Sequence, residues 1–338
     1  MSSPDIRATP EAPLLEVRHL RVEFPTRRGT LRAIDDVSFS IAPGEVLGVV
    51  GESGAGKSLT GAAIIGLLEP PGRIAAGEIL LNGERIDHLD PARMRRIRGK
   101  EIGAIFQDPL TSLNPLYTVG RQLTETIRTH LDLNAAQARE RAVELLASTG
   151  IPAAAARIDH YPHQFSGGMR QRVVIALALA AEPRLIVADE PTTALDVSIQ
   201  AQIIALLKTL CRERGTAVML VTHDMGVIAE TADRVAVMYA GRIAEIGPVA
   251  DVIHRPRHPY TVGLMGSIPK VGEHRTRLEQ IDGAMPRLGA IPQGCAFNPR
   301  CPMAFDHCRT HRPELIASGA TRAACWLLED SLQQDIAP

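Results

Sequence analysis

One eight-residue stretch of this chain carries a pattern suited to phosphate chemistry. Residues 51–58 read Gly-Glu-Ser-Gly-Ala-Gly-Lys-Ser and fit G-x-x-x-x-G-K-[ST] in full. In such a loop the backbone N–H groups converge on phosphate oxygens, Lys57 neutralises β- and γ-phosphate charge, and the Ser58 hydroxyl ligates Mg²⁺. An apolar run, Val46–Val50, precedes the loop, and a helical pattern, Leu59–Leu68, follows it. We therefore predict a nucleoside triphosphate site formed by Gly51, Ser53, Gly54, Ala55, Gly56, Lys57, Ser58 and Leu59.

A pair of carboxylates ends a second apolar run. Residues 184–190 read Arg-Leu-Ile-Val-Ala-Asp-Glu. Acids in this position can be a solvated strand end or a helix cap. Beside a phosphate loop, we interpret Asp189 as the residue that holds Mg²⁺ through water and Glu190 as the base that polarises the attacking water.

A third motif separates one class of phosphate-loop protein from the others. Residues 165–172 read Phe-Ser-Gly-Gly-Met-Arg-Gln-Arg and directly precede a long apolar helix. Here the chain resembles the ABC-transporter ATPases, and Ser166 with the N–H groups of Gly167 and Gly168 offers hydrogen bonds and a helix dipole to a phosphate. Since residues 51–58 already hold this chain's own phosphates, the motif should serve the γ-phosphate of a second subunit. That implies a head-to-tail dimer with ATP at its interface.

Further residues match the same family in order, and the resemblance covers roughly residues 14–253. Gln107 resembles the glutamine that senses Mg²⁺ and the attacking water and links to the transmembrane partner. Residues 194–196 (Ala-Leu-Asp) resemble a loop at the dimer interface, which gives Asp196 a role there. His223 resembles the switch histidine that contacts the γ-phosphate.

The residue that stacks on adenine is left open. The family places an aromatic side chain upstream of the phosphate loop, and Phe24 is the candidate. Residues 27–31 read as a small insertion, so Arg28 is an alternative that would stack through its guanidinium, and Phe24 would then be strand core.

The C-terminal part narrows the resemblance to one branch. Residues 258–261 read His-Pro-Tyr-Thr, as in the C-terminal extension of the dipeptide, oligopeptide and nickel importer ATPases. The variant with Met169 resembles the first of the two non-identical ATPases that these importers usually carry.

Four cysteines follow in this extension with the spacing C-x5-C-x6-C-x16-C. Four thiols so close together favour a soft metal, but C-x-x-C pairs typical of zinc sites are missing. The resemblance favours a [4Fe–4S] cluster, while zinc and free thiols stay open, with His307 as a substitute ligand. Cys211 is interpreted as packed. The proposed ligands are Cys295, Cys301, Cys308 and Cys325.

The elements that must position these residues alternate between strand and helix. Apolar runs at 46–50, 185–188 and 217–221 predict a mainly parallel sheet covered by helices. Residues 77–86 predict a hairpin around Asn82-Gly83, and residues 117–156 have a helical texture without strand signals. We predict an α/β phosphate-loop core with an antiparallel β subdomain and a helical subdomain near 108–166. The domains are an ABC ATPase domain at 1–253 and a Cys-rich extension at 254–338.

Composition excludes some classes of function. With 37 basic and 38 acidic residues, the net charge is −1, which is not the footprint of a nucleic-acid-binding protein. The longest apolar run, Val173–Ala181, is too short to span a bilayer, and the first thirty residues lack a signal-peptide core. We therefore expect a cytosolic protein whose membrane contact goes through partners, and the resemblance implies a peripheral position at the cytoplasmic face of the inner membrane.

The resemblance implies an ATP-hydrolysing subunit of a membrane importer for di- or oligopeptides. Its expected partners are a paralogous ATPase, two transmembrane permease subunits and, indirectly, an extracytoplasmic solute-binding protein. Import of nickel or another small solute is the alternative, and a non-transport ABC ATPase acting on DNA or ribosomes is the rival outside transport. A phosphate-loop kinase leaves Ser166 without a role, and a redox-regulated extension is a further alternative.

Overall fold

The computed structural model describes residues 12–192, 196–267 and 280–329, and within them the chain forms two sheets. The first is a four-stranded antiparallel sheet in the order β2-β1-β4-β5. Its strands are β1 (Leu15–Thr26), β2 (Gly29–Ile41), β4 (Arg73–Leu81) and β5 (Glu84–Arg85). The β4–β5 hairpin turns at Asn82 and Gly83, whose φ angles of 52° and 79° suit a two-residue hairpin turn, so that prediction is confirmed.

The second sheet has eight strands in the order β11-β12-β10-β9-β3-β8-β7-β6. Its central pairs are parallel, so β3, β8, β7 and β6 end at the same edge. Parallel strands covered on both faces are apolar throughout, as predicted for 46–50, 185–188 and 217–221. The strands are β3 (Val46–Val50), β6 (Ile102–Ile105), β7 (Leu185–Asp189), β8 (Ala217–Val221), β9 (Arg234–Tyr239), β10 (Arg242–Pro248), β11 (Ile316–Ser318) and β12 (Thr321–Ala323).

Two apolar clusters fill the two faces of this sheet. Side chains alternate across a strand, and β3 follows that rule: Val46 and Val50 join one cluster, whereas Leu47 and Val49 join the other. The first cluster extends into the helical region, and the second packs against the antiparallel sheet. The phosphate loop, which follows β3, is therefore anchored between both halves of the core.

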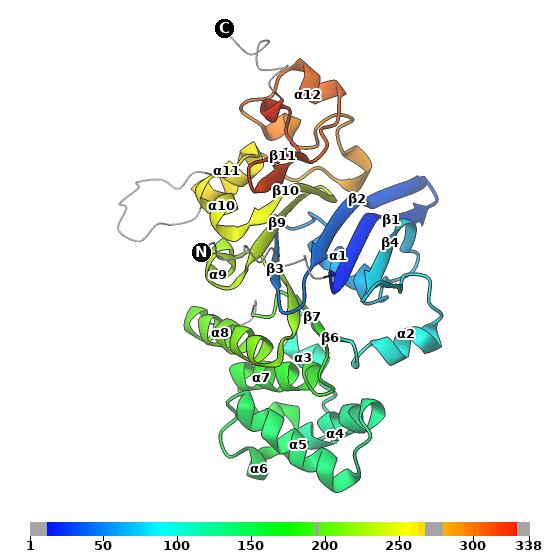
Figure 1. Cartoon of the computed structure of the whole chain (residues 1–338), viewed down its shortest axis with the longest axis vertical. Helices are drawn as coiled ribbons and strands as arrows, with labels where there is room; N and C mark the ends of the chain where they lie inside the picture. The colour runs from blue at the N-terminus through cyan, green and yellow to red at the C-terminus, as the bar shows by residue number, and fades with distance from the viewer. Residues whose placement is uncertain (1–11, 193–195, 268–279, 330–338) are drawn as a thin grey trace, which may run out of the picture.

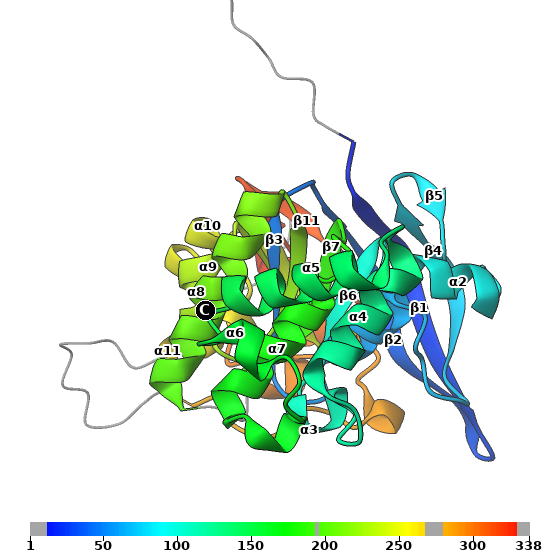
Figure 2. The same ribbon diagram turned by 90° about the horizontal axis from the view of Figure 1, so that it is seen from below.

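Helices alone connect β6 to β7, which confirms the predicted helical subdomain. Near 108–166 lie α3 (Pro109–Ser112), α4 (Val119–His130), α5 (Ala135–Ser148) and α6 (Ala154–Arg157), and α7 (Gly167–Ala178) follows them. The side chains of Thr118 and Asn134 accept hydrogen bonds from first-turn N–H groups and set the starts of α4 and α5. In Figure 1 these helices lie below the eight-stranded sheet, and in Figure 2, seen from below, they lie in front.

The remaining helices are short apart from α8. The helix after the phosphate loop starts two residues earlier than predicted and ends sooner, because Gly66 adopts a positive φ of 65° just beyond it. These helices are α1 (Lys57–Ile64), α2 (Pro91–Ile97), α8 (Val197–Arg214), α9 (Met225–Thr231), α10 (Val249–His254), α11 (Pro259–Gly266) and α12 (Asp306–Thr310). None of the helices in the described ranges combines the length and apolarity needed to cross a membrane.

The C-terminal extension (residues 254–338) is joined to the main sheet. Its strand β12 pairs with β10 through Glu245↔Ala323 and Ile246↔Arg322. No strand was predicted after residue 221. The six and seven residues of β9 and β10 were missed, and the three-residue strands β11 and β12 are too short to show a period. The pairing adds residues 316–323 of the extension to the sheet whose strand β3 precedes the phosphate loop (Figure 1).

Candidate functional site

Catalytic candidates from four separate segments meet at the edge where the parallel strands end. The loop after β3 supplies Lys57 and Ser58, and β7 ends at Asp189. Gln107 follows β6 and His223 follows β8. A crevice at the carboxyl ends of parallel strands is the usual ligand position in open α/β sheets.

The loop conformation requires glycine at two positions. Gly51 has φ 149° and Gly56 has φ 101°. A Cβ on Gly51 would lie 2.2 Å from the Met238 carbonyl oxygen, and one on Gly56 would lie 2.6 Å from Cδ1 of Ile34. Side chains at either position would force the loop open, which explains why the pattern has glycine there. The loop is therefore shaped closely enough to present its N–H groups to phosphate.

Lys57 is the buried cation of the site. Its side chain folds back over the loop, and Nζ donates to the carbonyl oxygens of Gly51 at 2.8 Å and Glu52 at 3.1 Å. Burial lowers the pKa of Lys57, and the charges of Glu190 and Asp189 oppose that shift. A phosphate anion would supply the opposite charge that this ammonium needs.

Ser58 and Asp189, the two candidate Mg²⁺ ligands, are hydrogen-bonded to each other. The Ser58 hydroxyl donates to Oδ1 of Asp189 at 2.9 Å. Burial raises the pKa of Asp189, the Ser58 hydrogen bond opposes the rise, and the charge of Glu190 adds to it. Two neighbouring carboxylates are costly without a cation. The oxygen donors and their charge fit Mg²⁺.

Glu190 is held from two sides. Nε2 of Gln107 donates to one carboxylate oxygen at 3.1 Å, and Nδ1 of His223 lies 3.3 Å from the other. Its backbone has φ 44°, unusual for a non-glycine residue, and its N–H donates to the Val221 carbonyl at 2.9 Å. Strained backbone of this kind concentrates at functional sites. The arrangement can orient a carboxylate toward a water and a histidine toward a phosphate.

The motif at residues 165–172, called the signature motif from here on, lies apart from the phosphate loop. Ser166 is the N-cap of α7, and its side chain accepts a hydrogen bond from the Met169 N–H at 3.4 Å. Helix α7 packs on α3, α4, α5, α8 and β6. In Figure 1 it lies among the lower helices, whereas α1 lies beside the antiparallel sheet. Gly167 and Gly168 form the first turn of α7. The chain thus presents this motif outward, apart from its own phosphate loop.

Other predicted residues are only partly placed. Asp196 is the exposed N-cap of α8, and residues 193–195 lie outside the described part of the chain. Phe24 is half-buried in β1, with its ring against Gly72: a Cβ there would lie 2.7 Å from Cε1 of Phe24. Arg28 is exposed in the turn between β1 and β2. The residue that stacks on adenine stays a prediction.

The four cysteines of the extension line one small cavity of about 10 Å³. Burial raises the pKa of Cys295 to about 11 and that of Cys325 to about 12. Over residues 12–192, 196–267 and 280–329, no three His, Cys, Asp or Glu side chains are arranged as a metal site. The donors suit a soft metal, but the space holds about one water, so a cluster would require the thiols to separate. His307 stacks on His311, and Cys211 is buried in α8, where burial raises its pKa to about 12.

The His-Pro-Tyr-Thr motif has a structural explanation that the sequence did not show. The fully buried carboxylate of Glu245 on β10 accepts from the N–H groups of Arg257 and His258, each at 2.9 Å. This fixes the start of α11 and directs Tyr260 into the core. The Tyr260 hydroxyl accepts from the Glu52 N–H at 2.9 Å. The extension therefore contacts the phosphate loop, a contact that sequence reasoning missed.

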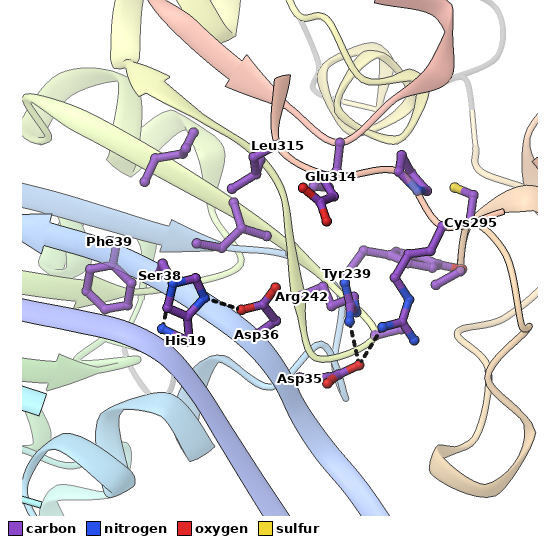
Figure 3. A pocket seen from close by; sticks show the side chains of 18 of the residues that line it. His19, Asp35, Asp36, Ser38, Phe39, Tyr239, Arg242, Cys295, Glu314 and Leu315 are labelled. Carbon is purple, nitrogen blue, oxygen red and sulfur yellow. Dashed lines mark hydrogen bonds and ion pairs between the residues drawn. The ribbon is translucent and has the colours of Figure 1, made fainter. Parts of the chain in front are cut away.

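A large cavity of about 1360 Å³ lies elsewhere, between β1, β2, β10 and the extension (Figure 3). In it Asp35 bridges two arginines from distant segments: Arg242 at 2.5 Å and Arg312 at 3.0 Å. Burial alone would raise the pKa of Asp35, but Arg242 and Arg312 lower it overall. None of the catalytic candidates lines this cavity, so it is separate from the phosphate loop.

The fold and the phosphate-loop site define an ATPase of the ATP-binding-cassette type. The family model "ABC transporter" matches residues 34–193, and "Oligopeptide/dipeptide transporter, C-terminal region" matches residues 244–308. The chain belongs to the ABC transporter ATP-binding proteins, in the branch that carries this oligopeptide/dipeptide C-terminal region.

Similar proteins support that assignment over almost the whole length. The dipeptide transport ATP-binding protein DppD of Escherichia coli K12 is 46% identical over 94% of this chain and 98% of its own. DppD of Bacillus subtilis 168 is also 46% identical, over 96% of this chain and 97% of its own. A putative peptide import ATP-binding protein of Brucella abortus is 47% identical over 93% and 95%, respectively.

Solved structures agree on the fold. The dimeric ATP-binding cassette MJ0796, in a post-hydrolysis state with ADP and Pi, has a TM-score of 0.63 at 30% identity. The match covers 70% of this chain and 98% of that one. The cassette cbiO1 of Clostridium perfringens has a TM-score of 0.62 at 29% identity, covering 72% and 92%.

Proposed function

We propose that this chain hydrolyses ATP to energise a membrane importer of di- or oligopeptides. The observation that carries the proposal is the match, over nearly the full length, to peptide-transport ATP-binding proteins, including the C-terminal region. The Lys57–Ser58–Asp189–Glu190 arrangement supports the ATPase activity. Nickel or another small solute is the competing cargo.

Each catalytic residue has a distinct task in this mechanism. Lys57 neutralises charge on the β- and γ-phosphates, and Glu190 takes the proton of the attacking water. Gln107 and His223 hold the Glu190 carboxylate from either side, so that it faces the reaction centre. Mg²⁺, held by Ser58 and Asp189, would supply charge neutralisation at the phosphates.

The exposed signature motif supports a two-subunit site. Ser166, Gly167 and Gly168 would contact the γ-phosphate bound by a second, paralogous ATPase, and Asp196 would lie at that interface. ATP favours the closed dimer, and hydrolysis releases it, which is a population shift by a ligand. At the cytoplasmic face of the inner membrane, two transmembrane permease subunits would receive this motion, and an extracytoplasmic binding protein would deliver the solute.

Three finer assignments complete the proposal. The division into an ATPase domain at 1–253 and an extension at 254–338 follows the composition change near His254. Phe24 is our first choice for the adenine contact, with Arg28 as the alternative. The four extension cysteines hold a [4Fe–4S] cluster, a choice supported by thiolate chemistry and by the four thiols lining one cavity, which would have to widen to admit it.

The test is transport by the assembled complex. The chain is co-purified with its permease partners and reconstituted into vesicles with the cognate binding protein. Uptake of labelled dipeptides, tripeptides and Ni²⁺ is then measured with and without ATP. ATP-dependent peptide uptake is expected. Uptake of Ni²⁺ alone would overturn the peptide assignment, and ATPase activity without any solute stimulation would point away from transport.

A further inference from the structure

The phosphate loop is contacted from outside by the C-terminal extension. Nη1 of Arg300 lies 3.0 Å from both carboxylate oxygens of Glu52, the second residue of the loop. The Arg300 side chain is 7% exposed. Met285 of the extension lies near the same loop, because a Cβ on Gly54 would be 4.0 Å from its Cγ. The extension thus covers the loop at both Glu52 and Gly54.

Arg300 is fixed before it reaches Glu52. Its Nε donates to the Asp282 carbonyl at 2.8 Å, and Nη2 donates to the Ile281 carbonyl at 3.2 Å. Nη1 also lies 3.4 Å from the Tyr239 hydroxyl. A guanidinium held by this many partners is pre-organised, so little side-chain entropy opposes the ion pair.

The negative charge of Glu52 is unfavourable beside a phosphate site, and Arg300 neutralises it. The residue lies in a loop that must receive a triphosphate, and its backbone carbonyl already accepts from Nζ of Lys57 at 3.1 Å. An uncompensated carboxylate there would repel the phosphates and compete for the Lys57 cation. At effective dielectric values near ~20, such a charge acts over several ångströms.

We propose that Arg300 is a positioning residue of the ATP site: it neutralises and holds Glu52, so that the C-terminal extension sets the affinity of the phosphate loop for nucleotide. The Tyr260 hydroxyl, which accepts from the Glu52 N–H, holds the same residue by its backbone. The loop of this chain is therefore complete only with the extension docked. This inference rests on the ATPase activity and not on the nature of the transported solute.

The test is a charge cycle on the full-length chain. Arg300→Met keeps the aliphatic volume and removes the charge, and Glu52→Gln removes the carboxylate. Affinities for AMP, ADP and the non-hydrolysable ATP analogue adenylyl imidodiphosphate are measured by titration calorimetry. We expect Arg300→Met to weaken binding of the ATP analogue roughly tenfold, binding of ADP less, and binding of AMP hardly at all. The order follows because the uncompensated Glu52 charge repels each additional phosphate charge. The double variant should bind the analogue within threefold of wild type.

Two controls separate this role from simple docking of the extension. Arg312→Ala breaks another ion pair between the extension and the body, Arg312–Asp35 at 3.0 Å, without touching the loop. It should bind the analogue within twofold of wild type. Arg300→Lys keeps the charge but loses the guanidinium contacts to the Asp282 and Ile281 carbonyls, so its loss of affinity should be smaller than that of Arg300→Met.

Several results would overturn the proposal. One is an Arg300→Met variant that binds the analogue as wild type does, and another is a double variant as weak as Arg300→Met. Equal losses for Arg312→Ala and Arg300→Met would mean that docking, and not the Glu52 charge, controls affinity. A loss for Arg300→Lys as large as for Arg300→Met would exclude charge as the cause, even where Arg300→Met folds poorly.

Discussion

Replacing Glu190 by Gln separates nucleotide binding from hydrolysis. The substitution keeps the side-chain length but removes the group that accepts a proton from water. Gln107 and His223 lie within 3.3 Å of the Glu190 oxygens, so the replacement amide remains held in the same place. Loss of a positioned general base typically costs ~10²–10⁴ in rate, which is ~3–5 kcal/mol of transition-state stabilisation.

Binding should survive this change for an electrostatic reason. Glu190 is a negative charge that acts on both Lys57 and Asp189. Its removal lowers the repulsion that incoming phosphates meet. ATP affinity is therefore expected to be equal to or tighter than that of wild type, and the ATP-bound dimer should accumulate.

The assay is phosphate release with the assembled complex, alongside ATP binding and size-exclusion chromatography in ATP and Mg²⁺. Glu182→Gln is the matched control, because it makes the same chemical change at an exposed residue that pairs with Arg141. We expect the control to hydrolyse ATP like wild type. Turnover of Glu190→Gln within threefold of wild type would remove Glu190 from the chemistry, and a loss of ATP binding would refute the electrostatic reasoning.

Three further predictions concern other parts of the chain. Ser166→Arg should leave ATP binding by the isolated chain nearly unchanged and depress hydrolysis by the assembled complex; loss of binding in isolation would place the motif in this chain's own site. Anaerobically purified protein should contain about four iron and four sulfide per chain. Replacing any of the four extension cysteines by Ser should lower this iron and sulfide content, whereas Cys211→Ser should not. One zinc per chain without sulfide would show that the site holds a structural metal in place of the cluster. Because the Asp35 pKa is lowered in the folded state, its ion pairs stabilise the fold above the unfolded value near ~4 and are lost as pH falls through the folded value. At pH 7 the free energy of unfolding measured by urea titration should be ~1–3 kcal/mol larger for wild type than for Asp35→Asn, and the gap should close in acid; a gap independent of pH would exclude this origin.

Much of the candidate site could be predicted from the sequence because its determinants are local. The loop at 51–58 needs glycine where φ is positive, and the strand before it needs apolar residues on both faces. Asp189 and His223 come directly after or at the end of apolar runs, so parallel pairing alone brings them together. The Asn82-Gly83 turn is likewise determined by two neighbouring residues.

Only the tertiary structure decided how the C-terminal extension is used. Strand β12 has three residues and pairs with β10. A strand this short shows no alternation of apolar and polar residues from which the pairing could be predicted. Arg300 meets Glu52 across 248 positions, and Arg312 meets Asp35 across 277. Neither pair produces a local sequence pattern, because an arginine that binds a distant carboxylate has the same sequence context as a solvated arginine. The four cysteines were visible as a set, but their collapse around one small cavity depends on the packing of Phe297, Trp326 and His258 about them. Long-range ion pairs and short docked strands are properties of the packed chain, because their energy comes from neighbours that only folding supplies.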